Sequence, residues 1–183
     1  MTRQPADDGT LRQLSHDQTL TWIERHHAWR LARKTKPMWA RRIEPAEVGQ
    51  EFQTADHVAQ VAKEGFWLCV GVAGEPWFQA AERVGEKYER RAEEVRQFAF
   101  DKQPRTYGVF HPREALLNWA AQVNDPAVAG FFIRPRYDPG RPLYSAVGGY
   151  VVKDHVSDPY TDKVEEVWLV QQELFDSTYE FVP

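Results

Sequence analysis

Apolar residues recur at helical spacing in the N-terminal part of the chain, which predicts a helix there. The helix is expected to begin at Ser15, because Gln18 three residues later completes a capping-box pattern. Pro37 ends the run, since proline cannot continue a helix interior. Residues 1–14 are polar and predict a flexible tail. The residues on the apolar face are Leu20, Ile23, His27 and Leu31.

After this helix the pattern alternates between β-rich and helical segments. Strand-like runs of large apolar residues are interrupted by two stretches with helical spacing, and Asn-Asp-Pro at 124–126 ends the second stretch. The expected segments are, in chain order, a β-rich region over 43–78, a helix over 79–98, a short strand over 103–110, a helix over 113–123 and a β-rich region with a final short helix over 131–182.

Two parts of the chain share one spacing of aromatic and acidic residues, which indicates an internal duplication. The offsets are identical in both parts and contain no gap. Each copy is expected to hold two strands joined by a turn, followed by a short helix, over residues 43–89 and 133–180. The matched residues are Glu75, Trp77, Glu82, Val84, Tyr88 and Glu89 in the first copy, and Glu166, Trp168, Glu173, Phe175, Tyr179 and Glu180 in the second.

The match extends upstream, where Gly65–Leu68 corresponds to Gly148–Val151 and Ile43–Pro45 to Ile133–Pro135. Neither copy buries much of a core alone, so the two are expected to pack together. The sequence therefore predicts an α+β protein made of two diverged β-rich units, each ending in a helix. The predicted segments are a flexible tail over 1–14, a basic N-terminal helix and linker over 15–42, a first β-rich repeat with its helix over 43–99, a helical connector over 100–130 and a second β-rich repeat over 131–183.

Both copies place a glycine before a strand of large apolar residues, then a turn and a Trp. The residues concerned are Gly65, Trp67, Leu68, Gly74, Glu75, Trp77, Val84 and Tyr88 in one copy and Gly148, Tyr150, Val151, Trp168, Leu169, Val170, Phe175 and Tyr179 in the other. The arrangement resembles a small domain family of bacteria and their phages named for its Pro-Gly-Asp-Tyr-Gly (PGDYG) signature. Phe66 and Gly149 replace the aspartate of that signature. The resemblance implies the fold of each copy and a phage or prophage origin, and it implies no activity.

Basic residues are concentrated in one segment of the chain. Seven basic residues and no acid lie between Arg25 and Arg42, so this segment carries +7 while the whole chain carries −4 and the remainder −11. Cationic side chains beside flat rings suit phosphate groups and stacked bases. We therefore predict a binding site for an anionic ligand (a nucleotide or nucleic acid) or an acidic protein surface. Alternatively, the charges form a solvated face or neutralise the acidic remainder. The predicted site residues are Arg30, Arg33, Lys34, Trp39, Arg41 and Arg42.

Three residues are candidates for acid–base chemistry on a nucleotide or other phosphorylated substrate. Glu75 and Glu166 hold equivalent turn positions beside a Trp, and two carboxylates in different environments can act as general acid and base. His155, between Asp154 and Asp158, is the third. No nucleophile elbow or phosphate-binding glycine loop is present in the sequence. A non-enzymatic binding or accessory protein is therefore the leading hypothesis, with a small enzyme second. The third is a protein–protein interaction module that forms a homo-oligomer through exposed β edges.

Composition sets the remaining expectations. The chain is 42% hydrophobic and 27% charged, as is typical of globular proteins. It has no run of about 18 apolar residues, so no membrane span is expected. The single cysteine, Cys69, allows no intrachain disulfide and is expected to be an inert core thiol. The six histidines lack metal-ligand spacing, and neither a metal nor a cofactor is expected. With no secretory signal at the N-terminus, the expected location is the cytoplasm.

Overall fold

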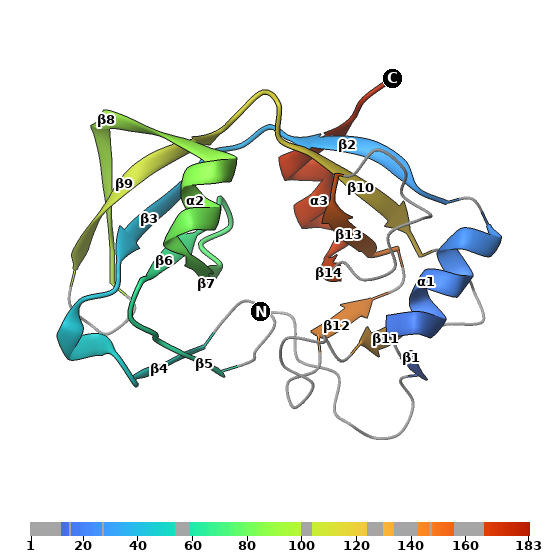
Figure 1. Cartoon of the computed structure of the whole chain (residues 1–183), viewed down its shortest axis with the longest axis horizontal. Coiled ribbons are helices and arrows are strands. Elements are labelled where there is room, and N and C mark those ends of the chain that lie inside the picture. Colours follow the sequence, from blue (N-terminus) through green and yellow to red (C-terminus); the bar gives the residue numbers. More distant parts are fainter. Residues whose placement is uncertain are drawn as a thin grey trace. The chain divides into compact units, whose positions relative to one another are not determined.

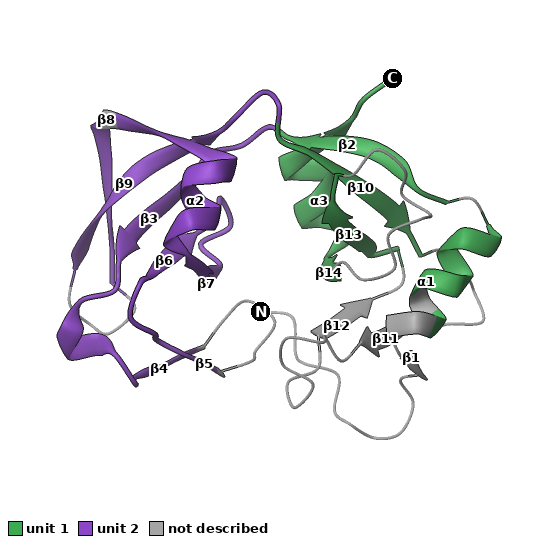
Figure 2. Ribbon diagram, in the orientation of Figure 1, with its two compact units in different colours: residues 1–34, 116–183 green, residues 35–115 purple. Residues whose placement is uncertain are grey.

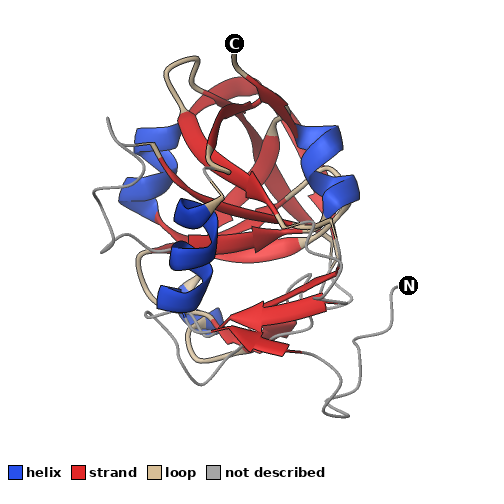
Figure 3. Ribbon diagram, turned by 90° about the vertical axis from the view of Figure 1, so that its right-hand side faces the viewer, coloured by secondary structure: helices blue, strands red, loops and turns tan. Residues whose placement is uncertain are grey.

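The chain has an α+β fold, as the sequence predicts (Figure 1, Figure 3). The computed structural model describes residues 12–14, 16–26, 28–53, 59–99, 104–123, 130–133, 143–146, 148–155 and 167–183. Two compact units divide the chain: unit 1 comprises residues 1–34 and 116–183, and unit 2 comprises residues 35–115 (Figure 2). None of the described helices is long and apolar enough to span a membrane.

Unit 2 contains a five-stranded antiparallel sheet, a short α-helix and a two-stranded sheet. Its elements are β3 (Met38–Arg42), η1 (Pro45–Glu47), β4 (Glu51–Gln53), β5 (Ala59–Val61), β6 (Phe66–Val70), β7 (Pro76–Ala80), α2 (Ala81–Lys87), β8 (Tyr88–Phe98) and β9 (Arg105–Pro112). The large sheet has the order β7-β6-β3-β9-β8, and β4 pairs with β5. Leu68, Val70 and Tyr107 form a buried cluster on one face of the large sheet.

Unit 1 contains a second five-stranded antiparallel sheet, two helices and a three-stranded sheet. Its elements are β1 (Arg12–Leu14), α1 (His16–Arg25), β2 (Arg30–Lys34), β10 (Leu117–Gln122), β11 (Gly130–Ile133), β12 (Leu143–Ala146), β13 (Tyr150–Asp154), β14 (Val167–Val170), α3 (Gln172–Thr178) and β15 (Tyr179–Phe181). The sheet orders are β14-β13-β10-β2-β15 and β1-β11-β12. Leu20 and Ile23 of α1 pack against Val151. Lys153 is also buried, with its Nζ 5.5 Å from the ring centre of Trp29.

The two five-stranded sheets have the same strand order and connections. In each, a central strand (β3 or β10) pairs with a hairpin (β6–β7 or β13–β14), and a seven-residue helix then leads to an edge strand (β8 or β15). Each helix is followed by a Tyr whose backbone N–H donates to the carbonyl of the residue four positions earlier. Each hairpin is preceded by a glycine with positive φ. The equivalent pairs are Gly65 and Gly148, Val84 and Phe175, and Tyr88 and Tyr179.

In each five-stranded sheet, the fourth strand in the sheet order comes from the other half of the chain than the remaining four strands. β2 directly precedes β3, but it pairs with β10 and β15 in unit 1. In the same way, β9 directly precedes β10, but it pairs with β3 and β8 in unit 2. Apart from η1, the chain segments β2–β8 and β9–β15 therefore carry the same succession of strands and helices. Each segment contributes its first strand to the five-stranded sheet whose other four strands come from the other segment.

The upstream part of the sequence alignment is wrong. The backbone N–H of Ile43 donates to the carbonyl of Phe66 at 3.0 Å. In unit 1 the backbone N–H of Val123 donates in the same way to the carbonyl of Gly149 at 3.0 Å. Ile43 therefore corresponds to Val123 rather than to Ile133. Two short segments that both begin with isoleucine and reach proline two residues later are too weak a signal to fix an alignment.

The basic segment is not helical, contrary to the expectation. Helix α1 ends at Arg25, and the basic residues that follow lie in β2 and β3, except for Lys36 between the two strands. Along β3, buried and less buried positions alternate as in a half-buried strand. Hydrogen bonds to strands distant in sequence satisfy this backbone, and they outweigh the short-range helical spacing. Ser15 and His27, which belong to the expected helix, lie outside the described residues.

The expected connector helix is also a strand. Residues 117–122 form β10, the central strand of unit 1, and Ala120 and Ala121 are both fully buried because the sheet is covered on both faces. A strand buried on both faces loses the period-two pattern that would identify it. The helix expected over 79–98 spans only Ala81–Lys87, and the rest forms β8. The unit boundaries accordingly fall after residues 34 and 115, inside segments that the sequence assigns to helices.

Candidate ligand site

The six sequence-predicted site residues are divided between the two units. Arg30, Arg33 and Lys34 belong to β2 in unit 1, and Trp39, Arg41 and Arg42 belong to β3 in unit 2.

The three residues on β2 all contact the neighbouring edge strand β15. Arg33 forms an ion pair with Glu180, in which Nε donates to Oε1 at 2.5 Å. Both side chains are about half exposed, so the pair contributes little to stability. The other two cations lie over aromatic rings of the same strand, Arg30 at 3.7 Å from the centre of Phe181 and Lys34 at 5.9 Å from that of Tyr179.

Arg41 is held inside unit 2 by Glu47. Its Nη1 and Nη2 donate to the two carboxylate oxygens at 2.6 and 2.5 Å, and the side chains are only 10% and 4% exposed. Burial lowers the pKa of Arg41, but the hydrogen bonds and charge interactions with Glu47 and Tyr107 together raise it by more. The hydrogen bond from Arg41 holds the pKa of Glu47 below its usual value despite burial. Arg41 is thus part of a buried structural ion pair.

Trp39 lies on the same face of β3 as Arg41 and packs into the core. It contacts the cluster around Leu68, and its ring centre is 5.6 Å from that of Phe98. The guanidinium of Arg96 covers it at 4.7 Å. Side chains alternate along a strand, so Arg42 points to the opposite face of the sheet. The structure therefore separates Trp39 and Arg41 from Arg42.

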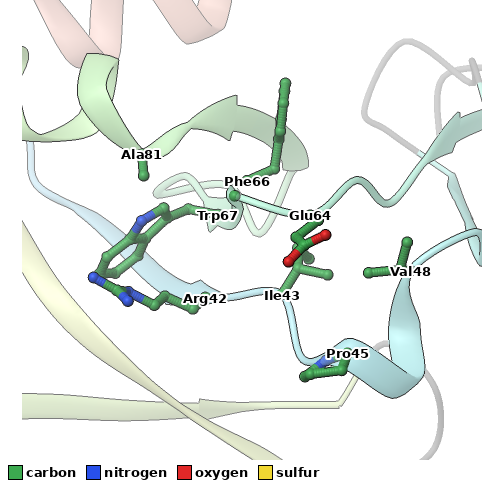
Figure 4. A pocket seen from close by; sticks show the side chains of 9 residues that line it. Arg42, Ile43, Pro45, Val48, Glu64, Phe66, Trp67 and Ala81 are labelled. Carbon is green, nitrogen blue, oxygen red and sulfur yellow. The ribbon is translucent and has the colours of Figure 1, made fainter.

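Arg42 lines a pocket of about 590 Å³ in unit 2 (Figure 4). It is exposed, and its guanidinium carbon lies 5.7 Å from the ring centre of Trp67. Among the described residues it has no carboxylate partner. The carboxylate of Glu64 also faces the pocket, and Phe66, Ile43 and Val48 contribute apolar walls.

A glycine turn places the pocket residues. Gly65 has φ 77°, a conformation that favours glycine, and it reverses the chain just before β6. Its carbonyl accepts the backbone N–H of Ala81 at 3.1 Å, which ties the start of α2 to the turn. Glu64 and Phe66 flank this glycine, while Trp67 pairs with Arg42 across the two strands. The pocket thus forms where the β3–β6 pair meets the beginning of α2.

The sequence predicts Arg42 as a site residue but not Glu64, Phe66 or Trp67. The sequence signal that could have identified Glu64 and Phe66 is their position, because they flank Gly65 of the predicted repeat. The indole Nε1–H of Trp67 is buried without a hydrogen-bond partner in the described part of the chain. A buried donor in this state destabilises the protein by about 1–3 kcal/mol.

The equivalent position in unit 1 is filled by protein side chains. Gln122, which replaces Arg42, donates its Nε2 to the carbonyl of Gly148 at 3.0 Å. Tyr150, which replaces Trp67, is 5% exposed and stacks on Phe175 with ring centres 3.7 Å apart. Burial and the nearby Asp176 raise the pKa of Tyr150 above its ordinary value, so its hydroxyl stays neutral at physiological pH.

The described residues do not bring the three catalytic candidates together in one site. Glu75 lies in the β6–β7 turn of unit 2, where its backbone carbonyl accepts the N–H of Gly71 at 2.9 Å and its carboxylate folds over that glycine. His155 lies in unit 1, with its ring 5.5 Å from that of Trp119. Glu166 falls outside the described residues. In the described ranges, no three His, Cys, Asp or Glu side chains gather as metal ligands would.

Comparisons with protein-family models, with curated proteins and with solved structures found no match for this chain.

Proposed function

We propose that this protein is a non-enzymatic binding protein that holds an anionic ligand in the pocket of unit 2, with Arg42 as the anchor. One observation carries the proposal: Arg42 is exposed at the pocket and has no carboxylate partner among the described residues. The other arginines of the basic segment that were predicted as site residues contact groups of their own unit, namely Phe181, Glu180 and Glu47.

The surroundings of Arg42 favour a small ligand over an acidic protein surface. The site is a concave pocket, and its volume of about 590 Å³ falls in the range of small-molecule sites. A guanidinium donates charge-assisted hydrogen bonds to phosphate or carboxylate oxygens. The apolar side chains of Ile43 and Val48 keep part of the pocket wall free of competing polar groups.

We also propose that the two units arose by duplication and that only one copy retains the pocket. The shared strand order and the equivalent glycine, helix and Tyr positions support this origin. The PGDYG resemblance and a phage or prophage source remain part of this proposal, and neither affects the assignment of the pocket.

Association through β edges receives less support. Edge strand β8 spans 11 residues, and its described side chains include the exposed and charged Glu89, Arg91 and Glu93. Charged side chains along an edge oppose pairing with another strand.

Isothermal titration of the full chain with ribose 5-phosphate and the four ribonucleoside monophosphates tests the proposal. We expect at least one of these anions to bind with a stoichiometry of one. Arg42→Glu should weaken that binding by more than tenfold, because it replaces the anchor by a like charge. Lys36→Glu makes the same charge change at an exposed residue of unit 2 outside the pocket and should have little effect. If none of the five anions binds, or if both variants weaken binding equally, the proposal is wrong.

A further inference from the structure

Two opposite charges face the pocket of unit 2 without pairing to other described charges. Arg42 and Glu64 are both exposed side chains of its lining, and neither forms an ion pair within the described part of the chain (Figure 4). The guanidinium offers only hydrogen-bond donors, and the ionised carboxylate offers only acceptors. A ligand that satisfies both must present an anion or acceptor to Arg42 and donors to Glu64.

Aromatic side chains form the flat part of the same pocket. Trp67 and Phe66 both line the pocket and are half-buried. The ring of Trp67 lies beside Arg42, whereas Phe66, the preceding residue of the strand, points away from them (Figure 4). Planar heterocycles stack on such side chains and on guanidinium groups, and their edges remain available for hydrogen bonds. Phe110 packs edge-on against the ring of Trp67, with the ring centres 5.1 Å apart and the planes at 83°. This wall therefore suits a flat ring.

A carboxylate discriminates between nucleobases by the donors on their edges. Guanine presents two adjacent N–H donors, its ring N1–H and its exocyclic amino group, which match the two oxygens of one carboxylate. Adenine and cytosine place a ring acceptor beside their amino group, and that acceptor would face the negative charge of Glu64. Uracil presents one N–H between two carbonyl oxygens. Guanine is the one common base whose edge complements Glu64 fully.

We propose that the pocket binds a guanine nucleotide, with the base edge on Glu64, the ring against Trp67 and the phosphate on Arg42. This assignment rests on the proposed function and adds the identity of the ligand's base. The volume of about 590 Å³ is sufficient for a mononucleotide. In the described part of unit 1, Gln122 and Tyr150 fill the position that corresponds to Arg42 and Trp67.

Titration of the full chain with GMP, AMP, ribose 5-phosphate and L-tryptophan tests the assignment. We expect GMP to bind about tenfold or more tightly than AMP, the discrimination typical of one bidentate pair. Glu64→Gln should remove this preference by weakening GMP while leaving AMP nearly unchanged. Glu93→Gln, at an exposed position of β8 away from the pocket, should retain it. Arg42→Gln should weaken GMP and AMP alike.

The outcomes separate the two proposals. Equal affinity for GMP and AMP, or an unchanged preference in Glu64→Gln, overturns the guanine assignment. If ribose 5-phosphate still binds in that case through Arg42, the anion-binding function stands. Tighter binding of L-tryptophan than of GMP also overturns the guanine assignment, because the pocket would then select a zwitterion. Absence of binding by every anion overturns both proposals.

Discussion

Trp39 and Trp119 occupy the same position in the two five-stranded sheets. Each lies on the central strand, opposite one residue of the hairpin and one residue of the strand contributed by the other half of the chain. The opposed residues are Val70 and Val109 for Trp39, and Lys153 and Leu31 for Trp119. Each Trp is also followed by a buried alanine. The correspondence of the two five-stranded sheets therefore extends to their central strands.

The buried pair of Arg41 and Glu47 should contribute strongly to the stability of unit 2. Arg41→Met leaves the Glu47 carboxylate buried without its partner, so we expect the free energy of unfolding to fall by about 3 kcal/mol. Arg33→Met breaks a half-exposed pair and should cost about 1 kcal/mol or less. Urea denaturation of both variants measures the difference. Equal losses would show that burial of the first pair has no energetic consequence.

The same pair predicts a dependence of stability on pH. The pKa of Glu47 is lowered in the folded state, chiefly by the hydrogen bond from Arg41. The ionised Glu47 carboxylate therefore stabilises the folded protein fully at pH values above the pKa of an unfolded Glu, about 4.3. This stabilisation is lost as the pH falls below about 4.3 and through the lowered pKa of Glu47 in the folded state. The stability difference between the wild type and Arg41→Met should thus be largest near pH 6 and shrink toward pH 3. A difference that stays constant over this range would contradict the assignment.

Two glycines of unit 2 should respond to alanine with opposite signs. Gly65 has φ 77°, so Gly65→Ala is expected to lose about 1–2 kcal/mol of unfolding free energy although no atom lies within 4 Å of the added Cβ. Gly85 lies inside α2 and also has open space around its Cβ position. Gly85→Ala should therefore gain up to about 1 kcal/mol. Thermal unfolding of the two variants measures both changes, and a gain for Gly65→Ala would rule out the left-handed turn that positions Glu64 and Phe66.

Sequence patterns predicted the fold class and the hairpin–helix part of each unit, but not the central strands. The regular offsets around Trp77 and Trp168 mark a hairpin and a helix that are local in sequence. The strands β2, β3 and β10 form only because they pair with partners distant in sequence. In β10 the adjacent buried alanines also imitate the apolar side of a helix. The Trp-Ala pair shared by β3 and β10 was the available signal, and the expected helix over 113–123 concealed it.

The candidate site was predictable only in part for the same reason. Composition identifies a basic segment, and one of its residues, Arg42, lines the pocket. Composition does not show that Arg41 and Arg42 point to opposite faces of the sheet. This follows from the alternation of side chains along a strand, whereas the sequence pattern predicted a helix for part of this segment. Glu64 and Trp67 join Arg42 through the pairing of β3 with β6, which no local pattern specifies.

An NMR titration of the uniformly ¹⁵N-labelled full chain with GMP locates the binding site residue by residue. We expect the indole N–H resonance of Trp67 and the backbone amide resonances of Arg42 and Gly65 to shift with increasing GMP. The resonances of β2 and β15 in unit 1 should not move. Shifts confined to Arg30, Lys34 and their neighbours, or no shifts at millimolar GMP, would contradict the claim that the pocket of unit 2 is the binding site.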